Sequence, residues 1–337
     1  MKSEHHIQTV AVIGAGSWGT ALAVHLARLG HEVRLWGRDA ALVADMQARR
    51  ANAVYLADLT FPDSLQPTNS LALALTDSRM VILAVPSHGL RQILHQASRS
   101  IAPGALVVSA TKGLEEHTLL RMSEVVAMEL PQVSELAVLS GPSFAVELAR
   151  ELPTAVVVAS ATNGAVEHVQ HEFRSGALRL YGSSDVVGVE IGGAFKNIIA
   201  IAAGVVEGLG LGHNALAALI TRGLAEISRL AVALGAQRDT LAGLAGLGDL
   251  VLTCTGQLSR NRHVGTELAH GRRLEEILAS TKMVAEGVRT TRAALELGAR
   301  HGIELPIAAQ MANVLEGRRD PKSAVYELMG RRQRQED

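Results

Sequence analysis

The stretch Thr9-Val10-Ala11-Val12-Ile13-Gly14-Ala15-Gly16-Ser17-Trp18-Gly19 decides how the first half of this chain folds. A short apolar run is followed at once by the spacing G-x-G-x-x-G, and a helical pattern continues from it over residues 18–29. In that context Gly14 permits a tight turn, Gly16 lets the backbone approach a pyrophosphate, and Gly19 lets the helix pack closely on the strand. The segment predicts a dinucleotide-binding turn, with a purely structural glycine turn as the alternative.

Further apolar runs follow along the first half. Turn residues bound each of them and a helical pattern separates each from the next, which predicts a parallel sheet built from strand–helix–strand units. The runs cover residues 32–36, 80–85, 105–110, 136–140 and 155–160, with 178–181 as a candidate last strand. Residues 52–63 interrupt the alternation, and we interpret them as an irregular insertion loop.

The second half has a different texture. From Val186 onward, helical patterns rich in Ala, Leu and Gly dominate, and we recognise no strand. A chain of 337 residues is long enough for about two domains. We therefore expect an α/β fold plus an all-α fold: a Rossmann-like, doubly wound parallel sheet over residues 1–188 and a helical domain over 189–337.

Composition excludes several classes of protein. The formal net charge of −1 argues against a generally basic nucleic-acid binder. No apolar run approaches the roughly 18 residues of a membrane span, so we expect a protein that does not cross a membrane. The single cysteine, Cys254, forms no intrachain disulfide, which favours the reducing cytoplasm. It has no evident catalytic partner, and the 13 histidines are scattered, so we expect neither thiol catalysis nor a metal site.

The end of the second strand bears on cofactor choice. An NAD site usually places an acid there to bind the ribose 2′-hydroxyl. Here Arg38 comes first and Asp39 follows it. Because a guanidinium pairs well with phosphate, Arg38 favours NADPH/NADP, while use of NADH/NAD stays open. The alternative is a solvated Arg38 beside an Asp39 that caps the next helix.

Other strand ends carry polar groups toward the same edge of the sheet. Lys112 follows the run 105–110 and offers a cation for a phosphate. Gly141 and Ser143 follow the run 136–140 and suit an oxygen-rich ligand, although Ser143 also reads as a helix cap. His88 follows the run 80–85, where a surface role is the stronger interpretation.

The helical half contains one conspicuous charge, Lys196, within an apolar, glycine-containing helix. A lysine in such surroundings needs a partner, and it can serve as a proton donor or as a clamp on a carbonyl. Asp249, in Gly246-Leu247-Gly248-Asp249-Leu250, is a natural partner. Arg260 and Asn261 offer a planar fork and an amide to phosphate oxygens. The alternatives are a snorkelling Lys196, a helix-capping Asp249 and an exposed Arg260.

Together these motifs closely resemble those of bacterial-type NAD(P)-dependent glycerol-3-phosphate dehydrogenases. The resemblance runs from about Thr9 to Leu328 and is carried by GAGSWGTALA (14–23), AVPSH (84–88), ATKGLE (110–115), LSGPSFA (139–145), GGAFKNIIAIAAG (192–204), GLAGLGDLVLTC (243–254), SRNRHVG (259–265) and VAEGV (284–288). It implies reduction of dihydroxyacetone phosphate to sn-glycerol 3-phosphate for phospholipid synthesis. It also implies a helical domain like that of 6-phosphogluconate dehydrogenase.

The resemblance implies a role for each matching residue. Lys196 resembles the catalytic proton donor. Substrate contacts implied are Lys112, Gly141, Ser143, Lys196, Asp249, Ser259, Arg260 and Asn261. Cofactor contacts implied, together with the three motif glycines Gly14, Gly16 and Gly19, are Ser17, Trp18, Arg38, Lys112, Ala145, Arg260, Val284 and Glu286.

Two other functions stay open on the residues alone. One is a related dehydrogenase for a hydroxy acid or sugar acid, against which Lys112 and Arg260 argue because they favour a phosphate. The other is a catalytically silent NADP-binding regulator, which would not need Lys196 with Asp249. The apolar helical half could also supply the face of a homodimer.

Overall fold

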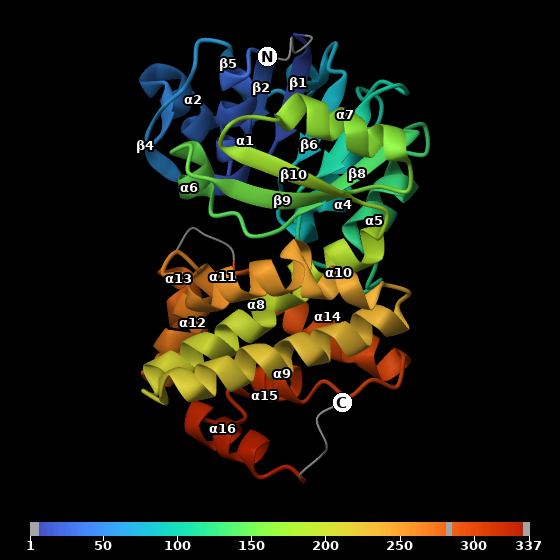
Figure 1. Cartoon of the computed structure of the whole chain (residues 1–337). Helices are drawn as coiled ribbons and strands as arrows, with labels where there is room; N and C mark the ends of the chain where they lie inside the picture. The colour runs from blue at the N-terminus through green and yellow to red at the C-terminus, as the bar shows by residue number, and fades with distance from the viewer. Residues whose placement is uncertain (1–6, 281–284, 333–337) are drawn as a thin grey trace. The chain divides into compact units, whose positions relative to one another are not determined.

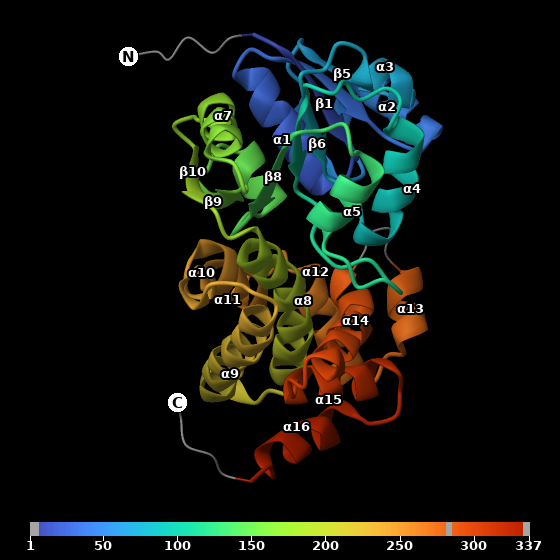
Figure 2. The ribbon, with the colours of Figure 1, turned by 90° about the vertical axis from the view of Figure 1, so that its right-hand side faces the viewer.

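The computed structural model of this chain describes residues 7–280 and 285–332 (Figures 1 and 2). The chain divides into two compact units. The first contains residues 1–115 and 120–190, and the second contains 116–119 and 191–337. The first unit is a sheet covered by helices, and the second is helical.

An eight-stranded sheet forms the centre of the first unit, in the order β10-β9-β8-β7-β6-β1-β2-β5. Its central strands are buried on both faces, which explains why they read as continuous apolar runs rather than as alternating patterns. The strands are β1 (Thr9–Ile13), β2 (Glu32–Trp36), β5 (Leu65–Thr68), β6 (Met80–Leu83), β7 (Leu106–Ser109), β8 (Glu135–Ser140), β9 (Thr154–Ala159) and β10 (Leu178–Ser183).

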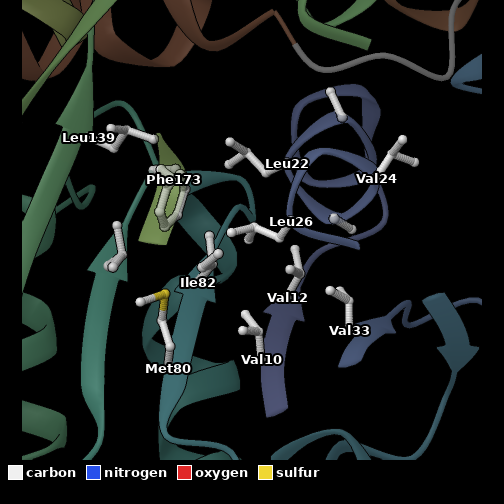
Figure 3. Close-up of a cluster of buried hydrophobic side chains, with 14 of the residues drawn as sticks. Val10, Val12, Leu22, Val24, Leu26, Val33, Met80, Ile82, Leu139 and Phe173 are labelled. Atoms are coloured by element: carbon white, nitrogen blue, oxygen red, sulfur yellow. The ribbon is translucent and has the colours of Figure 1, made fainter. Parts of the chain in front are cut away.

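Helices cover both faces of this sheet. One face packs α1, α6 and α7, and the other packs α3, α4 and α5. In Figure 3, Leu26 of α1 lies over Val12 and Ile82, and Leu22 points toward Phe173 of α7. Pleating turns Ala11 to the opposite face. The helices of this unit are α1 (Ser17–Arg28), α2 (Ala40–Arg49), α3 (Leu71–Leu75), α4 (Ser87–Ala97), α5 (Met122–Glu129), α6 (Ala145–Ala149) and α7 (Asn163–Phe173).

The parallel order expected from the sequence holds from β5 through β8, and it is wrong at β9. Strand β9 pairs antiparallel with β8, with Leu139 opposite Val158, and β10 then runs parallel to β9. To run parallel to β8, strand β9 would need a connection that returns along the full length of the strands, usually as a helix. The only helix in this connection, α6, has five residues and is too short for that return, so the chain re-enters the sheet at the end where β8 stops.

The segment 52–63 is also more regular than we expected. It forms most of an antiparallel hairpin of β3 (Ala51–Asn52) and β4 (Leu56–Thr60), so its interpretation as an irregular loop is wrong. The pattern hid the hairpin because these strands are short and polar residues interrupt them. Strand β5 and helix α3, which follow the hairpin, were not predicted. Strand β5 contains Pro67, which lowers its sequence signal, yet it fits at an edge of the sheet.

In the second unit, helices pack around α8. Gly204 of α8 and Gly265 of α12 allow the two backbones to approach so closely that a Cβ at either position would lie 1.9 Å from a carbonyl oxygen of the other helix. The elements are α8 (Val186–Gly208), α9 (Gly212–Ala233), α10 (Arg238–Ala242), a π-helical turn (Leu244–Gly248), α11 (Asp249–Thr255), α12 (Arg260–Ala269), α13 (Leu274–Ala279), α14 (Glu286–Arg300), α15 (Pro306–Leu315) and α16 (Pro321–Met329).

Helix α8 is long and apolar enough to cross a membrane by length and composition, with a mean hydropathy of 1.6. However, 89% of the residues in its most apolar window are buried inside the protein. A helix that is apolar all round and covered by other helices is a core helix. Its first residues, including Glu190, belong to the first unit, where the Glu190 carboxylate accepts hydrogen bonds from Arg121 and Ser123.

Helix α15 receives its N-terminal cap from another helix. The buried carboxylate of Glu226, on α9, accepts the backbone N–H of Ile307 at 2.9 Å and that of Ala308 at 3.0 Å. Burial raises the pKa of Glu226 from its ordinary 4.5 to about 7, against the two backbone hydrogen bonds, which lower it. This acid therefore couples the packing of α9 and α15 to pH.

The raised pKa predicts a pH-dependent stability. Between pH 4.5 and about 7 the folded state keeps a proton on Glu226 that the unfolded chain loses, so stability falls as the pH rises. The loss should reach about 3 kcal/mol, since one pKa unit corresponds to about 1.4 kcal/mol. Urea unfolding across this range should show the slope in the parent chain and a smaller one in Glu226→Gln. The exposed-site control Glu296→Gln should keep it; an unchanged slope in Glu226→Gln would refute the assignment.

Candidate functional site

The glycine turn between β1 and α1 has the geometry of a dinucleotide-binding loop. Gly14 has φ of 121°, and a Cβ there would lie 2.4 Å from the carbonyl oxygen of Ala84. A Cβ on Gly19 would lie 1.9 Å from the carbonyl oxygen of Gly14. Both positions therefore require glycine.

The same turn leaves the start of α1 open. Gly16 is the N-cap of α1 and supplies no side-chain hydrogen bond to the first turn. A Cβ at Gly16 would meet no atom within 4 Å. Because N–H groups of a first helical turn lack intrahelical acceptors, an uncapped helix start beside open space fits a pyrophosphate. Ser17 and Trp18 are the first residues of this helix.

Arg38 and Asp39, which follow β2, have different surroundings. Asp39 is the N-cap of α2, and its Oδ1 accepts the backbone N–H groups of Ala41 and Leu42, as the capping alternative predicted. Arg38 is exposed. The acid at this strand end is thus engaged by the helix, and a guanidinium is presented to solvent beside it.

Lys112, Gly141 and Ser143 lie close together in the first unit. The Lys112 ammonium donates to the Gly141 carbonyl oxygen at 3.3 Å, and the Ser143 hydroxyl donates to that same oxygen at 2.9 Å. Our prediction that Ser143 caps α6 is wrong: Phe144 is the N-cap and Ala145 the first helical residue. The Ser143 hydroxyl bonds to the turn before the helix instead. His88 lies exposed on α4.

The Lys196 side chain is buried in the second unit and is held by two acceptors. Its ammonium donates to Asp249 Oδ1 and, at 2.8 Å, to Thr253 Oγ1. The Thr253 hydroxyl donates its own proton in a hydrogen bond to the backbone carbonyl of Asp249, at 2.7 Å. Its oxygen must therefore accept from the ammonium. The predicted pairing of Lys196 with Asp249 is confirmed, and the alternative of a snorkelling lysine is wrong.

Helix α12 brings together the next group of predicted residues. Ser259 is its N-cap and accepts the N–H of Arg262, and Arg260 is its exposed first residue. The buried amide of Asn261 donates to Asn197 Oδ1 at 2.9 Å and accepts the N–H of Gly287 at 3.0 Å. It thereby joins the helix that carries Lys196 to the start of α14, where Glu286 is the first residue. Val284, the remaining predicted cofactor contact, lies outside the described residues.

The lone thiol has no part in this cluster. Cys254 is buried, and that burial raises the pKa of its thiol to about 12, so it stays protonated at neutral pH. Within residues 7–280 and 285–332, no group of three or more His, Cys, Asp or Glu side chains could hold a metal ion.

Two participants near Lys196 received no role from the sequence. Thr253 lies four residues after Asp249 on one helix, and this spacing, which puts both side chains on the same face, is the signal that would have found it. Asn197 is the immediate neighbour of Lys196 and anchors Asn261. No spacing in the sequence links Asn197 to Asn261, because the two residues lie on different helices.

Comparison with known proteins identifies the family of this chain. Residues 9–166 match the family model for the NAD-dependent glycerol-3-phosphate dehydrogenase N-terminus, and residues 185–326 match the model for its C-terminus. The chain belongs to this family. A relative from Koribacter versatilis, named glycerol-3-phosphate dehydrogenase (NAD(P)+), is 51% identical over 96% of this chain and 97% of its own length. A Myxococcus xanthus protein of the same name is 50% identical over 97% and 98%.

Solved structures agree with the family assignment. The glycerol-3-phosphate dehydrogenase of Coxiella burnetii matches with a TM-score of 0.93 and 42% identity, over 96% of this chain and 99% of that one. A ketopantoate reductase of Ralstonia eutropha matches with a TM-score of 0.62 at 17% identity, over 94% and 99%, which shows a shared fold alone. The expected fold class, a Rossmann-like unit with a helical unit, is thus confirmed.

Proposed function

We propose that this chain catalyses the NAD(P)H-dependent reduction of dihydroxyacetone phosphate to sn-glycerol 3-phosphate in the cytoplasm, supplying glycerophospholipid synthesis. The observation that carries the proposal is the buried Lys196 ammonium held by Asp249 and Thr253, in a chain about half identical to named glycerol-3-phosphate dehydrogenases. The proposal includes a division of labour: residues 1–188 bind the dinucleotide, and 189–337 bind substrate and supply catalysis.

The first unit holds the cofactor in this proposal. Gly14, Gly16 and Gly19 admit the pyrophosphate, and the open start of α1 offers it N–H donors. The bound nicotinamide supplies a hydride to the substrate carbonyl. The residues of the first unit that we assign to the cofactor are Gly14, Gly16, Ser17, Trp18, Gly19, Arg38, Lys112 and Ala145, and those of the helical half are Arg260, Val284 and Glu286.

Lys196 supplies the proton. As the C2 carbonyl of the ketone is reduced, negative charge develops on its oxygen, and an ammonium can stabilise that charge and then protonate it. Asp249 and Thr253 hold the Lys196 nitrogen in one position, and the Asp249 carboxylate supplies the counter-charge that a buried ammonium needs. The Thr253 hydroxyl accepts a hydrogen bond from the ammonium without taking its proton, because an alcohol oxygen is a much weaker base than an amine.

Phosphate selectivity comes from the cationic and amide groups. Lys112 and Arg260 provide charge, and Asn261 provides an amide. The residues that we assign to substrate binding are Lys112, Gly141, Ser143, Lys196, Asp249, Ser259, Arg260 and Asn261. A homodimer built through the helical half belongs to the same proposal, and light scattering of the purified protein tests it.

The activity itself is tested with purified protein, NADPH and a panel of ketones. Consumption of NADPH should require dihydroxyacetone phosphate, with formation of an equal amount of glycerol 3-phosphate. Dihydroxyacetone, which lacks the phosphate, and a 2-oxo acid should be poor substrates. Preference for the 2-oxo acid would favour the related dehydrogenase, and cofactor binding without turnover would favour the silent regulator.

NADPH preference rests on Arg38. Arg38→Ala should lower the ratio of kcat/KM for NADPH to that for NADH by roughly ten- to a hundred-fold, since a hydrogen bond to a charged group contributes about 1.5–3 kcal/mol. The Asp39 cap should remain, because the substitution leaves α2 intact. Steady-state kinetics with both cofactors measures the ratio, and KM for NADH should change little. An unchanged ratio would remove Arg38 from cofactor discrimination.

A further inference from the structure

One buried amide links the β3–β4 hairpin to the glycine turn. The Asn52 side chain is fully buried, and its Nδ2 donates to the Ala15 carbonyl oxygen at 3.0 Å and to Thr20 Oγ1 at 2.9 Å. Its Oδ1 accepts the backbone N–H of Tyr55 at 3.2 Å. Ala15 lies inside the glycine turn, and Thr20 lies in the first turns of α1. Two of these hydrogen bonds therefore join the hairpin to the glycine turn and to α1, and the third, with Tyr55, lies within the hairpin.

The chemistry of the partners fixes the orientation of this amide. The Tyr55 N–H can only donate, so it selects the amide oxygen, and the Ala15 carbonyl can only accept, so it selects the amide nitrogen. The Thr20 hydroxyl takes the remaining N–H. Asparagine alone offers two donors and an acceptor at this length: aspartate lacks the donors, and glutamine is one methylene longer.

The hydrogen bond to the Ala15 carbonyl also fixes the direction of the Gly16 N–H. The Ala15 carbonyl and the Gly16 N–H belong to one planar peptide, and the described part of the chain contains no cis peptide bond. In a trans peptide these two groups point in opposite directions. When Asn52 holds the carbonyl on one side, the Gly16 N–H is aimed at the other. Gly16 is the uncapped N-cap of α1, beside open space.

We propose that Asn52 is a positioning residue for dinucleotide binding: by holding the Ala15 carbonyl, it aims the Gly16 N–H and the start of α1 at the pyrophosphate. This proposal rests on the proposed function, because it assigns the pyrophosphate to this turn. Asn52 does not touch the cofactor, and it acts only through the turn. The sequence pattern suggested an insertion loop at residues 52–63. In this proposal the hairpin that forms there instead positions the cofactor-binding turn.

Asn52→Asp tests the proposal with a side chain of the same shape. The variant keeps the acceptor for Tyr55 but presents an oxygen to the Ala15 carbonyl, and this repulsion should turn the peptide plane. We expect the Kd and the KM for NADPH to rise at least about tenfold, the loss expected when a donor to a charged group is misdirected. At saturating NADPH, kcat and the KM for dihydroxyacetone phosphate should stay near the parent values, which would separate weaker cofactor binding from slower chemistry.

Thr20→Val provides the matched control. It removes one buried partner of the same amide while leaving the bond to Ala15, so it should lower the melting temperature without weakening NADPH binding. If folded Asn52→Asp binds NADPH as tightly as Thr20→Val does, and both variants lose the same amount in melting temperature, the role of Asn52 is merely structural. That result would overturn the proposal. Should Asn52→Asp not fold, Asn52→Ala removes the bond without repulsion, and parental NADPH affinity in it would overturn the proposal equally.

Titration of the parent chain with NADPH distinguishes failure of the positioning role of Asn52 from failure of the proposed function. If the parent binds NADPH and reduces dihydroxyacetone phosphate while the folded Asn52 variants bind as tightly, the positioning role fails and the proposed function stands. If the parent binds neither NADPH nor NADH, both fail. Weakened NADPH binding in the Asn52 variants, with Thr20→Val near the parent, supports the positioning role.

Discussion

Replacing Lys196 by methionine should lower kcat by roughly a hundred- to ten-thousand-fold, the usual contribution of a positioned general acid. Methionine fills similar volume in the buried environment of α8 but carries no proton to donate. The glycine turn lies in the other unit and is not altered by the substitution. NADPH should therefore bind with nearly parental affinity in a fluorescence titration while steady-state turnover collapses.

Two further variants sharpen this result. Lys196→Arg keeps a positive charge but holds its proton at all working pH values, so it should also be inactive if proton donation is the role. Substantial turnover in Lys196→Arg would instead indicate an electrostatic clamp. Lys322→Met, a change at an exposed lysine on α16, is the matched control and should keep parental kcat. Parental turnover in Lys196→Met would contradict the assigned role outright.

Replacing Asp249 by asparagine should destabilise the folded protein by about 3–5 kcal/mol, because it leaves a buried ammonium without its counter-charge. Asp249 is fully buried and accepts from Lys196. Without the carboxylate, the Lys196 nitrogen also loses the acceptor that holds it in position, so kcat should fall as well. Urea unfolding measures the first effect and steady-state kinetics the second.

A double variant separates stability from catalysis. Replacing both partners, as Lys196→Met with Asp249→Leu, removes the unpaired charge and should recover much of the lost stability, since apolar substitutes for a buried pair are often neutral. Activity should not return, because no proton donor remains. Asp239→Asn, at an exposed acid on α10, should change neither property. Parental stability in Asp249→Asn would mean that the pair is not buried in solution.

Three features could be predicted because the residues that determine them are recognisable in the sequence itself. The turn at Gly14 was predictable because strand, glycine spacing and helix are contiguous. The pairing of Lys196 with Asp249 was predictable although the two are far apart in sequence, because each is a lone charge in apolar surroundings and burial demands a partner. The capping role of Asp39 follows from its place before a helix.

Other features depend on information that a pattern does not contain. An apolar run has no direction, so the pattern did not reveal that β9 enters the sheet antiparallel to β8. Asn52 lies in a strand of two residues, and its partner is the backbone carbonyl of Ala15, which leaves no trace in side-chain spacing. The cap of α15 by Glu226 likewise depends on the packing of two helices distant in sequence.

Transfer of a labelled hydride tests the central claim most directly. Purified protein is supplied with NADPH deuterated at the transferred position of its nicotinamide ring and with dihydroxyacetone phosphate. Our account predicts glycerol 3-phosphate with deuterium at C2, formed by the parent chain and lost in Lys196→Met. Bound NADPH that keeps its label, with no glycerol 3-phosphate formed by the parent chain, would contradict the account.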